Sequence, residues 1–385
     1  IMHFQFSEEH LMIQKAARDF AVNECLPGVI ERDEHQRFPH DQVMQLADLG
    51  FMGMMVSPGY GGAGMDTISY VLAMEEISKI DASVSVCMSV NNSLVTWGLD
   101  KYATEEQKQK YLVPLAQGKK DGQLYIGAFL LSEPEAGSDA TSQHTTAIDM
   151  GDHYLLNGTK NWITNGSSAS VYLVMAQTDA SKGSHGINTL IVEKHWPGVT
   201  VGAKENKLGI RGSDTHSISF NDVKVPKENR IGEDGFGFKF AMKTLAGGRI
   251  GIASQALGIA SGSYELSLKY SKERKAFGKE IMHHQAIQFK LADMATRIEA
   301  ARMLCLKAAW EKDNGIDYTL SSSMAKVFAS ETAMWCATEA VQIHGGYGFV
   351  KEYHVERFMR DAKITQIYEG TSEVQRIVIG RSILK

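Results

Sequence analysis

One carboxylate near the C-terminus has neighbours that suit acid–base chemistry. Glu369 stands between Tyr368 and Gly370, and neither lysine nor arginine lies three or four residues away, as it would on an ordinary solvated helix. An apolar setting raises the pKa of a carboxyl group towards neutrality, which would allow Glu369 to act as a general base. A glutamate in a surface loop is the other interpretation that these residue types allow.

The segments before Glu369 must position it. The basic run 359–365 has strand-like residue types, so we expect a strand there. After Gly237 the chain has a helical composition almost to its end. Apolar residues recur at alternating steps of four and three, which predicts a long helix within a bundle. These positions are Ile287, Leu291, Met294, Ile298, Ala301, Cys305 and Ala308.

The rest of the chain divides by composition. Residues 7 to about 125 have the composition of helices, interrupted at 25–28 and 57–62 by proline and glycine. Strand patterns follow at 171–176, 187–192 and 217–225, and Asn157-Gly158 predicts a hairpin turn between two further strands. We therefore expect an α+β chain, mostly α: an N-terminal helical domain (1–125), a middle β-domain (126–235) and a C-terminal helical bundle (236–385).

Several kinds of site are disfavoured by the sequence. The glycines of 59–64 fit GxGxxG, but the stretch lies between helical segments with no strand before it, so we interpret it as a loop. Only one of the thirteen histidines, His283, stands three residues after a glutamate (Glu280). A di-iron site needs paired Glu-x-x-His motifs on two helices, so we expect no bound metal. There is also no GxSxG elbow and no P-loop.

Composition limits the possible partners and compartment. The 385 residues are 43% hydrophobic and 22% charged, with a formal charge of −5, which argues against a nucleic-acid-binding protein. No apolar stretch is long enough to predict a membrane span. The four cysteines are far apart in sequence, as expected of reduced thiols. We expect a cytoplasmic protein of a bacterium, or a mitochondrial matrix protein if a transit peptide has been removed.

Six blocks of the sequence, in order, resemble those of the acyl-CoA dehydrogenase family. They are LSEPEAGSDA (131–140), KNWITNG (160–166), GGRIGIASQALGIA (247–260), ERKAFGK (273–279), QIHGGYG (342–348) and IYEGTSEVQR (367–376). The resemblance covers nearly the whole chain. It implies that family's fold: a helical N-terminal domain, a β-barrel-like middle domain and a C-terminal four-helix bundle.

The resemblance implies FAD as the cofactor and assigns it residues in the middle domain. Trp162 would cover one face of the flavin ring, Thr164 would bond its N5 edge, and Ser132 would face the pyrimidine end, where donors stabilise the reduced ring. Ser138 would contact both the cofactor and the CoA chain. The implied set is Phe129, Leu131, Ser132, Gly137, Ser138, Trp162, Ile163 and Thr164.

A second group, assigned by the same resemblance, would mostly reach the FAD of a neighbouring subunit. An arginine in this group suits pyrophosphate oxygens, and a glycine pair permits close backbone approach. A turn near the C-terminus would bind the adenosine half. Each FAD site would then need two chains, so a homotetramer, a dimer of dimers, is expected. The residues are Arg274, Phe277, Gln285, Gln342, Ile343, Gly345, Gly346, Thr371, Ser372 and Glu373.

The residues implied for acyl-CoA include one departure from the family pattern. Ala246 stands where most similar members have aspartate. Gly248 stands where the isovaleryl- and long-chain-type branches carry their catalytic glutamate, so the resemblance makes Glu369 the base in this chain. The substrate residues implied are Ser138, Ala246, Gly247, Gly248, Arg249, Tyr368 and Gly370.

The implied reaction is FAD-dependent α,β-dehydrogenation of an acyl-CoA to a trans-2-enoyl-CoA, with electrons passed to an electron-transfer flavoprotein. The stretch 85–94 resembles the pocket helix of short-chain (butyryl-CoA) dehydrogenases, and Ser85 replaces an arginine of the glutaryl-CoA branch. We expect a short straight-chain substrate. A short branched-chain acyl-CoA dehydrogenase, an acyl-CoA oxidase that uses oxygen, and a catalytically silent family member are also compatible with the resemblance.

Overall fold

The N-terminal part of the chain is a set of helices. The computed structural model describes residues 5–385. Ser7 caps the first helix by accepting a hydrogen bond from the backbone of His10, whose ring in turn accepts from the backbone of Ser7. The helices are α1 (Glu8–Phe20), α2 (Val29–Glu34), α3 (His40–Asp48), α4 (Thr67–Ser78), α5 (Ala82–Ser89), α6 (Trp97–Tyr102), α7 (Glu105–Gln107) and α8 (Val113–Gln117).

Two irregularities of this region matter for the site. The glycine-rich stretch 59–64 lies in the connection between α3 and α4, as expected, with one short 3₁₀ turn at Pro58–Tyr60. Between α5 and α6 the chain forms a π-helical stretch, Val90–Thr96, whose residues are all buried. The helices end at Gln117, earlier than expected. A small hairpin follows, made of β1 (Lys119–Lys120) and β2 (Gln123–Leu124).

The middle part forms one seven-stranded sheet in the order β3-β6-β4-β5-β9-β8, and β7 is also paired with β6. Pairing is antiparallel except where β6 lies parallel to β3 and β4. The expected strands at 171–176, 187–192 and 217–225 are confirmed. The strands are β3 (Gly127–Leu130), β4 (Thr146–Asp149), β5 (His153–Thr164), β6 (Val171–Gln177), β7 (Ile187–Glu193), β8 (Val199–Lys204) and β9 (Thr215–Pro226).

The expected hairpin at Asn157-Gly158 is wrong. Both residues lie inside the continuous strand β5, where the pairing with β9 shifts register. Asn157 exchanges two hydrogen bonds with Asp222 on β9, and Gly158, at φ +142°, lies so close to Thr145 that a side chain would clash. The glycine therefore accommodates a β-bulge rather than a turn.

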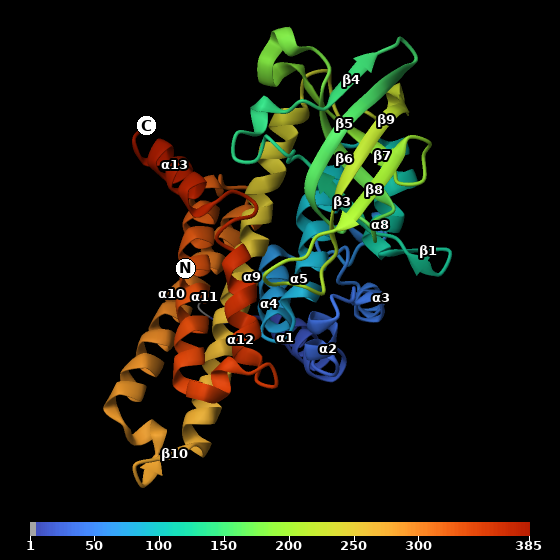
Figure 1. Cartoon of the computed structure of the whole chain (residues 1–385). Coiled ribbons are helices and arrows are strands. Elements are labelled where there is room, and N and C mark those ends of the chain that lie inside the picture. The colour runs from blue at the N-terminus through green and yellow to red at the C-terminus, as the bar shows by residue number, and fades with distance from the viewer. Residues whose placement is uncertain (1–4) are drawn as a thin grey trace.

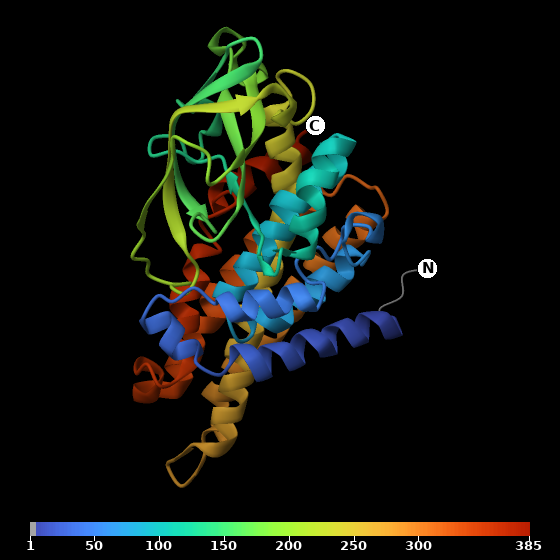
Figure 2. The ribbon, with the colours of Figure 1, turned by 90° about the vertical axis from the view of Figure 1, so that its right-hand side faces the viewer.

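The C-terminal part is dominated by the 37-residue helix α9 (Gly237–Glu273), which runs from the sheet to the hairpin of β10 (Lys275–Ala276) and β11 (Lys279–Glu280) at the far end (Figure 1). The remaining helices are α10 (Gln285–Asp313), α11 (Thr319–His344), α12 (His354–Ile364) and α13 (Ser372–Ile383). The seam expected along α10 is confirmed, since its central members Met294, Ile298, Ala301, Cys305 and Ala308 are buried. The N-terminal helices α4 and α5 pack against α9 (Figure 2).

The strand expected at 359–365 is wrong, because most of this segment belongs to α12. Val355, Phe358 and Ala362 recur at helical spacing and are buried, and Glu356 pairs with Arg360 one turn later. The β-branched residues at its end were outweighed by this amphipathic pattern. The chain is thus α+β and mostly α, with the helical, sheet and bundle parts in the expected order.

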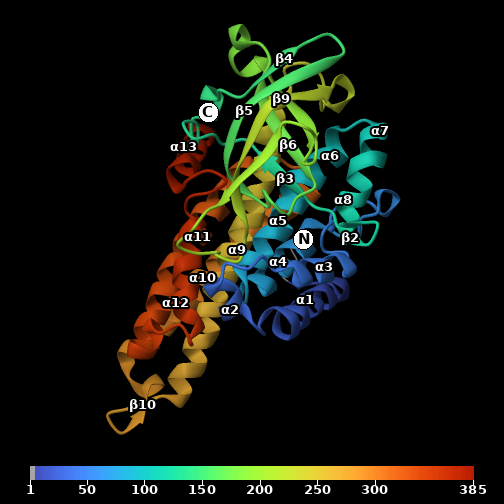
Figure 3. The same ribbon diagram turned by 45° about the vertical axis from the view of Figure 1, so that its right-hand side comes forward.

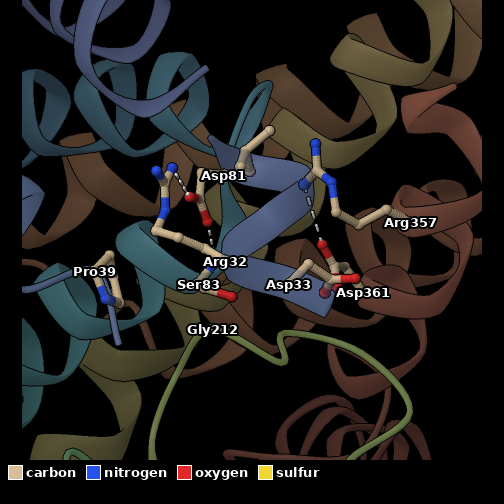
Figure 4. A pocket seen from close by; sticks show the side chains of 9 residues that line it. Arg32, Asp33, Pro39, Asp81, Ser83, Gly212, Arg357 and Asp361 are labelled. Atoms are coloured by element: carbon tan, nitrogen blue, oxygen red, sulfur yellow. Dashed lines mark hydrogen bonds and ion pairs between the residues drawn. The ribbon is translucent and has the colours of Figure 1, made fainter. Parts of the chain in front are cut away.

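A buried cluster of charges joins the three parts (Figure 4). Arg32 on α2 donates to Asp81 at 3.0 Å, and Arg357 on α12 lies 3.5 Å from Asp361. The carboxylate of Asp361 also accepts the backbone N–H of Ile210, from the loop between β8 and β9. Burial raises the pKa of Asp361 to about 7. These contacts fix α12, and with it the chain that leads towards α13.

Candidate active site

The loop between α12 and α13 holds Glu369 in a conformation that is rare for a residue with a side chain. Its φ is +53°, followed by +90° at Gly370. The Nε2 of Gln375 donates to the carbonyls of Glu369 and Gly370 at 3.2 and 3.0 Å, and the ammonium of Lys326 donates to the Gly370 carbonyl at 2.7 Å. Hydrogen bonds from two helices, α13 and α11, thus hold the strained turn in this conformation.

The carboxylate of Glu369 points at α9. A β-carbon on Gly248 would stand 2.1 Å from Oε2 of Glu369 and 2.7 Å from Cδ2 of Leu94, so the glycine leaves the space that the carboxylate occupies. Oε2 is buried and has no hydrogen-bond partner in the described chain. Leu94 belongs to the π-helical stretch, which closes the other side of this space. A buried, unpaired oxygen is uncommon and points to a functional group.

Electrostatics suit this carboxylate to take up a proton. Burial raises the pKa of Glu369 to about 7, although the positive charges of Lys326 and Arg249 oppose that rise. A pKa near the working pH is the value at which a general base is most effective. The interpretation of Glu369 as a surface-loop residue is therefore not supported by its surroundings.

The other residues expected around the substrate lie along α9 and beside Glu369. Arg249 is buried and donates to the hydroxyl of Ser323 at 3.3 Å, while its Nε has no partner in the described chain. Ala246 is buried on the same helix, and Gly247 has the ammonium of Lys312 and the hydroxyl of Tyr318 within 4 Å of where its β-carbon would be. Small residues thus keep this face of α9 open.

Gln255, for which the sequence gives no signal, is hydrogen-bonded to the side chain of Tyr368. Its side chain is fully buried and accepts a hydrogen bond from the Tyr368 hydroxyl. It also donates to the carbonyl of Ala82 at 2.9 Å and to Ser85 at 3.4 Å. Ser85 itself is fully buried and bonded to Ser78. These partners of Ser85 are uncharged, so the position offers a neutral environment in place of an arginine.

The middle domain brings Ser132 next to Trp162. Asn161 donates its backbone N–H to the Ser132 carbonyl at 2.9 Å, and the register between β5 and β9 shifts at this point. In the bulge Trp162 adopts φ +61°, which leaves its indole 60% exposed. Thr164 follows two residues later at the end of β5. An exposed aromatic ring beside this strand end offers a flat apolar platform.

Not every expected side chain in this domain faces that platform. Ile163 is buried in the domain core, and Leu131 packs against the side chains of β6, β7 and α9 with Phe129 beside it. These residues could meet a cofactor only through their backbones or edges. Gly137 and Ser138 lie in the exposed loop that follows β3.

A buried ion pair that sequence reasoning missed braces the same region. The ammonium of Lys160, which is fully buried on β5, lies 2.7 Å from Oε1 of Glu133 and 3.0 Å from the Leu131 carbonyl. Glu133 also accepts the backbone N–H groups of His144 and Thr145. The pair ties the strand that carries Trp162 to the segment that carries Ser132.

The residues expected to reach a neighbouring subunit fall in two places. Arg274 and Phe277 lie around the β10–β11 hairpin, at the opposite end of α9 from the sheet (Figure 3). The Phe277 ring is 96% exposed. Nearby Arg274, Ile343, Gly345 and Gly346 line an open hollow of about 720 Å³, while Gln285 begins α10 and Gln342 lies near the end of α11.

The expected adenosine turn lies elsewhere. Thr371 caps α13 by accepting a hydrogen bond from the backbone of Val374, and Ser372 and Glu373 form the first turn of that helix, close behind Glu369. The hydroxyl of Ser372 is buried without a partner in the described chain. Within one chain, therefore, these residues and Arg274 belong to separate surfaces.

Comparison with known proteins identifies the family. Three family models match in succession: the acyl-CoA dehydrogenase N-terminal domain over residues 7–119, the middle domain over 128–223 and the C-terminal domain over 235–384. The chain belongs to the acyl-CoA dehydrogenase family. Its cofactor is accordingly FAD, and its reaction is the dehydrogenation of an acyl-CoA at a CH–CH bond.

Individual acyl-CoA dehydrogenases are similar over the whole length. The short-chain specific acyl-CoA dehydrogenase of Clostridium acetobutylicum is 48% identical, and the match covers 100% of both chains. The structure of butyryl-CoA dehydrogenase from Megasphaera elsdenii has a TM-score of 0.97 at 48% identity, again over 100% of both chains. A structure described as the electron transferring flavoprotein of Acidaminococcus fermentans contains a chain with TM-score 0.97, 49% identity and the same coverage.

The residues of the middle domain fit the cofactor of an acyl-CoA dehydrogenase. The exposed indole of Trp162 suits a flat flavin ring, and the adjacent Ser132 and Thr164 supply hydroxyl groups at the same strand ends. Among residues 5–385, no group of three or more histidine, cysteine, aspartate or glutamate side chains is arranged to hold a metal ion. No helix in this range is both long and apolar enough to cross a membrane.

Lys326, Lys160 and Gln255 were not found by sequence reasoning. Lys326 could have been suspected, because it is the one cation in the small-residue run 321–330 of a helical segment. A lone lysine in such a run is buried unless the helix turns that face to solvent. Lys160 and Gln255 carry no comparable signal, since their partners are distant in sequence.

Proposed function

We propose that this acyl-CoA dehydrogenase oxidises short, straight-chain acyl-CoA thioesters of the butyryl type, with Glu369 as the base. The observation that carries the assignment is the buried Oε2 of Glu369, held against Gly248 with the pKa of the carboxyl raised to about 7. Bound FAD supplies the acceptor for the hydride that leaves the β-carbon. Glu369 takes the α-proton, and the product is the trans-2-enoyl-CoA.

The remaining residues bind and orient the thioester. The backbone N–H of Glu369 holds the thioester carbonyl and stabilises the charge that develops on it as the α-proton leaves. Ala246, Gly247, Gly248 and Arg249 border the acyl-CoA along α9, with Tyr368 and Gly370 on the opposite side and Ser138 towards the cofactor. The positively charged Arg249 remains near the reacting carboxylate.

The short-chain preference rests on Gln255. Its fully buried amide bridges Tyr368, Ala82 and Ser85, so a polar side chain with satisfied hydrogen bonds lies beside Tyr368, the neighbour of Glu369. Inserting a longer apolar tail there would break those bonds and leave buried groups unpaired, which is costly. The similarity to short-chain and butyryl-CoA dehydrogenases points the same way.

The proposal includes partners and a compartment. Trp162, Ser132 and Thr164 contact the flavin, while Arg274, Phe277 and the hollow beside Gly345 complete the FAD site of another subunit in a homotetramer, a dimer of dimers. The similarity to a chain in the A. fermentans structure supports an electron-transfer flavoprotein as acceptor. Four buried free cysteines support a reducing compartment, the bacterial cytoplasm or the mitochondrial matrix.

A chain-length series of acyl-CoAs, added anaerobically to the purified protein, tests the proposal through the visible band of the flavin. We expect the fastest bleaching with butyryl-CoA. E369Q should keep its FAD and lose about 10²–10⁴ in bleaching rate, because the amide cannot take the α-proton. Faster bleaching with a short branched-chain acyl-CoA would change the proposed substrate to that thioester. Full activity of E369Q would show that Glu369 is not the base.

An oxidase and a catalytically silent family member would behave differently in the same experiment. Rapid reoxidation of the reduced protein by oxygen, faster than by an electron-transfer flavoprotein, would indicate an oxidase. A FAD-containing protein that no acyl-CoA bleaches would indicate that the fold has lost its chemistry.

A further inference from the structure

We propose that Lys326 is a positioning residue for this dehydrogenation: its ammonium group fixes the Glu369–Gly370 turn and supplies positive charge beside the Glu369 carboxylate. The inference rests on the proposed role of Glu369 and adds to it the group on which that role depends.

The burial of Lys326 is the first observation. Its side chain has no exposed surface, and within the described chain no carboxylate lies within ion-pair distance of its nitrogen. Placing an ammonium group in such a site without a paired anion is costly. A methionine would fill a similar volume without that cost, so packing alone does not account for a lysine here.

The second observation is the one hydrogen bond that the Lys326 ammonium makes within residues 5–385. It goes to the Gly370 carbonyl at 2.7 Å, the residue directly after Glu369. Glu369 and Gly370 both have positive φ, and such a turn persists only when its surroundings hold it. Gln375 on α13 donates to the same carbonyl, so hydrogen bonds from both α11 and α13 stabilise the turn. These hydrogen bonds fix the backbone of the turn and therefore the direction in which the Glu369 side chain leaves it.

The charges that face Glu369 are the third observation. Lys326 approaches from α11 and Arg249 from α9, while Tyr70 on α4 and Tyr368 in the same loop are neutral. Of the two cations, Lys326 lowers the pKa of Glu369 more. Burial lowers the pKa of Lys326 itself to about 8, with Arg249 acting in the same direction and Glu369 and Glu373 against it. Lys326 is therefore still mostly charged at pH 7.

These contacts predict the direction in which the pH profile shifts when Lys326 is replaced. Glu369 must be ionised to accept the α-proton, so kcat/KM rises with pH through the pKa that Glu369 has in the free enzyme. Removing the cation removes the interaction that favours the ionised form, so the pKa of Glu369 rises and the acid limb moves to higher pH.

K326M, K326R and the parent enzyme, compared in kcat and KM against pH, test the inference. K15M, which removes an exposed lysine on α1, is the matched control and should behave as the parent. We expect the acid limb of kcat/KM for K326M to move up by about one pH unit, with kcat/KM at pH 6.5 about tenfold lower than that of the parent. K326R, which keeps the charge, should have an acid limb at the same pH as the parent enzyme.

An acid limb of K326M that coincides with that of the parent would overturn the inference, whatever its activity, because a merely structural lysine would change stability and leave the profile in place. FAD content and thermal unfolding of each variant identify misfolded protein. If K326M does not fold, K326Q carries the same prediction, since it removes the charge and keeps a hydrogen-bond donor. Failure of the proposed function itself would appear separately, as an active E369Q.

Discussion

Gly248 and Glu369 are in such close contact that no side chain fits between them: a β-carbon on Gly248 would stand 2.1 Å from Oε2 of Glu369. The two residues are 121 positions apart (369 minus 248) and belong to α9 and to the loop before α13. The absence of a side chain at one position thus defines the place of the carboxylate at the other.

G248A should therefore lower kcat by about 10- to 100-fold, because the carboxylate must move and small displacements of a catalytic group are costly. FAD binding should be unchanged. Steady-state kinetics with flavin quantification would measure both. G380A, on α13 where an added methyl group meets no atom within 4 Å, is the control and should leave kcat unchanged. An unaltered kcat in G248A would show that the carboxylate has room elsewhere.

Glu369 should destabilise the folded enzyme above neutral pH. Its pKa rises from 4.5 to about 7 on folding, so the folded state binds the proton more tightly than the unfolded state. The stability that the neutral carboxyl contributes is present below pH 4.5 and is lost as pH rises through 7.

E369Q, which stays neutral, should then unfold at a higher temperature than the parent at pH 8 and at nearly the same temperature at pH 4.5. The difference corresponds to about 2–3 kcal/mol. Asp361, whose pKa is also raised to about 7, is present in both proteins and cancels in the comparison. Equal unfolding temperatures at pH 8 would mean that the carboxylate is hydrated.

Breaking the pair of Lys160 and Glu133 should destabilise the middle domain. K160M leaves the buried carboxylate without its cation, at a cost of about 3–5 kcal/mol. Thermal unfolding and FAD retention measure the loss. The double variant K160M/E133Q should recover part of the stability, because no unpaired charge remains buried. A double variant no more stable than K160M would show that packing, rather than charge, is responsible.

Trp162 should report cofactor binding through its fluorescence. Because its indole is 60% exposed on the β5 bulge, a ring stacked on it would quench its emission. FAD added to the apoprotein should quench W162F much less than the parent. Trp310, half-exposed on α10, provides the control, since W310F should retain the quenching. Equal quenching of W162F and the parent would place the flavin elsewhere.

The sequence alone predicted the division into helical, sheet and helical parts and singled out Glu369. The structure confirms that division, which depends on local signals, namely hydrophobic periodicity and glycine and proline breaks. The role of Glu369 stays a prediction. Two local signals misled. Asn157-Gly158 has the composition of a hairpin turn, yet pairing with β9 keeps it extended in a long strand. The residues of α12 include strand formers, but the segment is helical because its apolar residues recur at helical spacing and are buried on one face.

The site's supporting residues could not be predicted because they depend on long-range packing. Lys326 meets Gly370 44 positions later, and Gln255 meets Tyr368 113 positions later. Nothing in the local sequence of either partner specifies the other. The resemblance supplied the residues proposed to touch ligands, whereas the residues that contact them from other helices became visible only in the packed structure.

The π-helical stretch Val90–Thr96 has a consequence for how this sequence can change in length. A π-helical turn accommodates more residues per turn than an α-helix, and here it turns Leu94 towards Gly248 and Glu369. Deleting a single residue from the stretch would restore α-helical spacing, which leaves the helix that follows nearly in register but redistributes the side chains of the stretch itself around the helix axis. The side chain that packs against Gly248 and Glu369 depends on that distribution. Natural insertions and deletions should therefore be excluded from this stretch and tolerated at exposed turns such as 150–152.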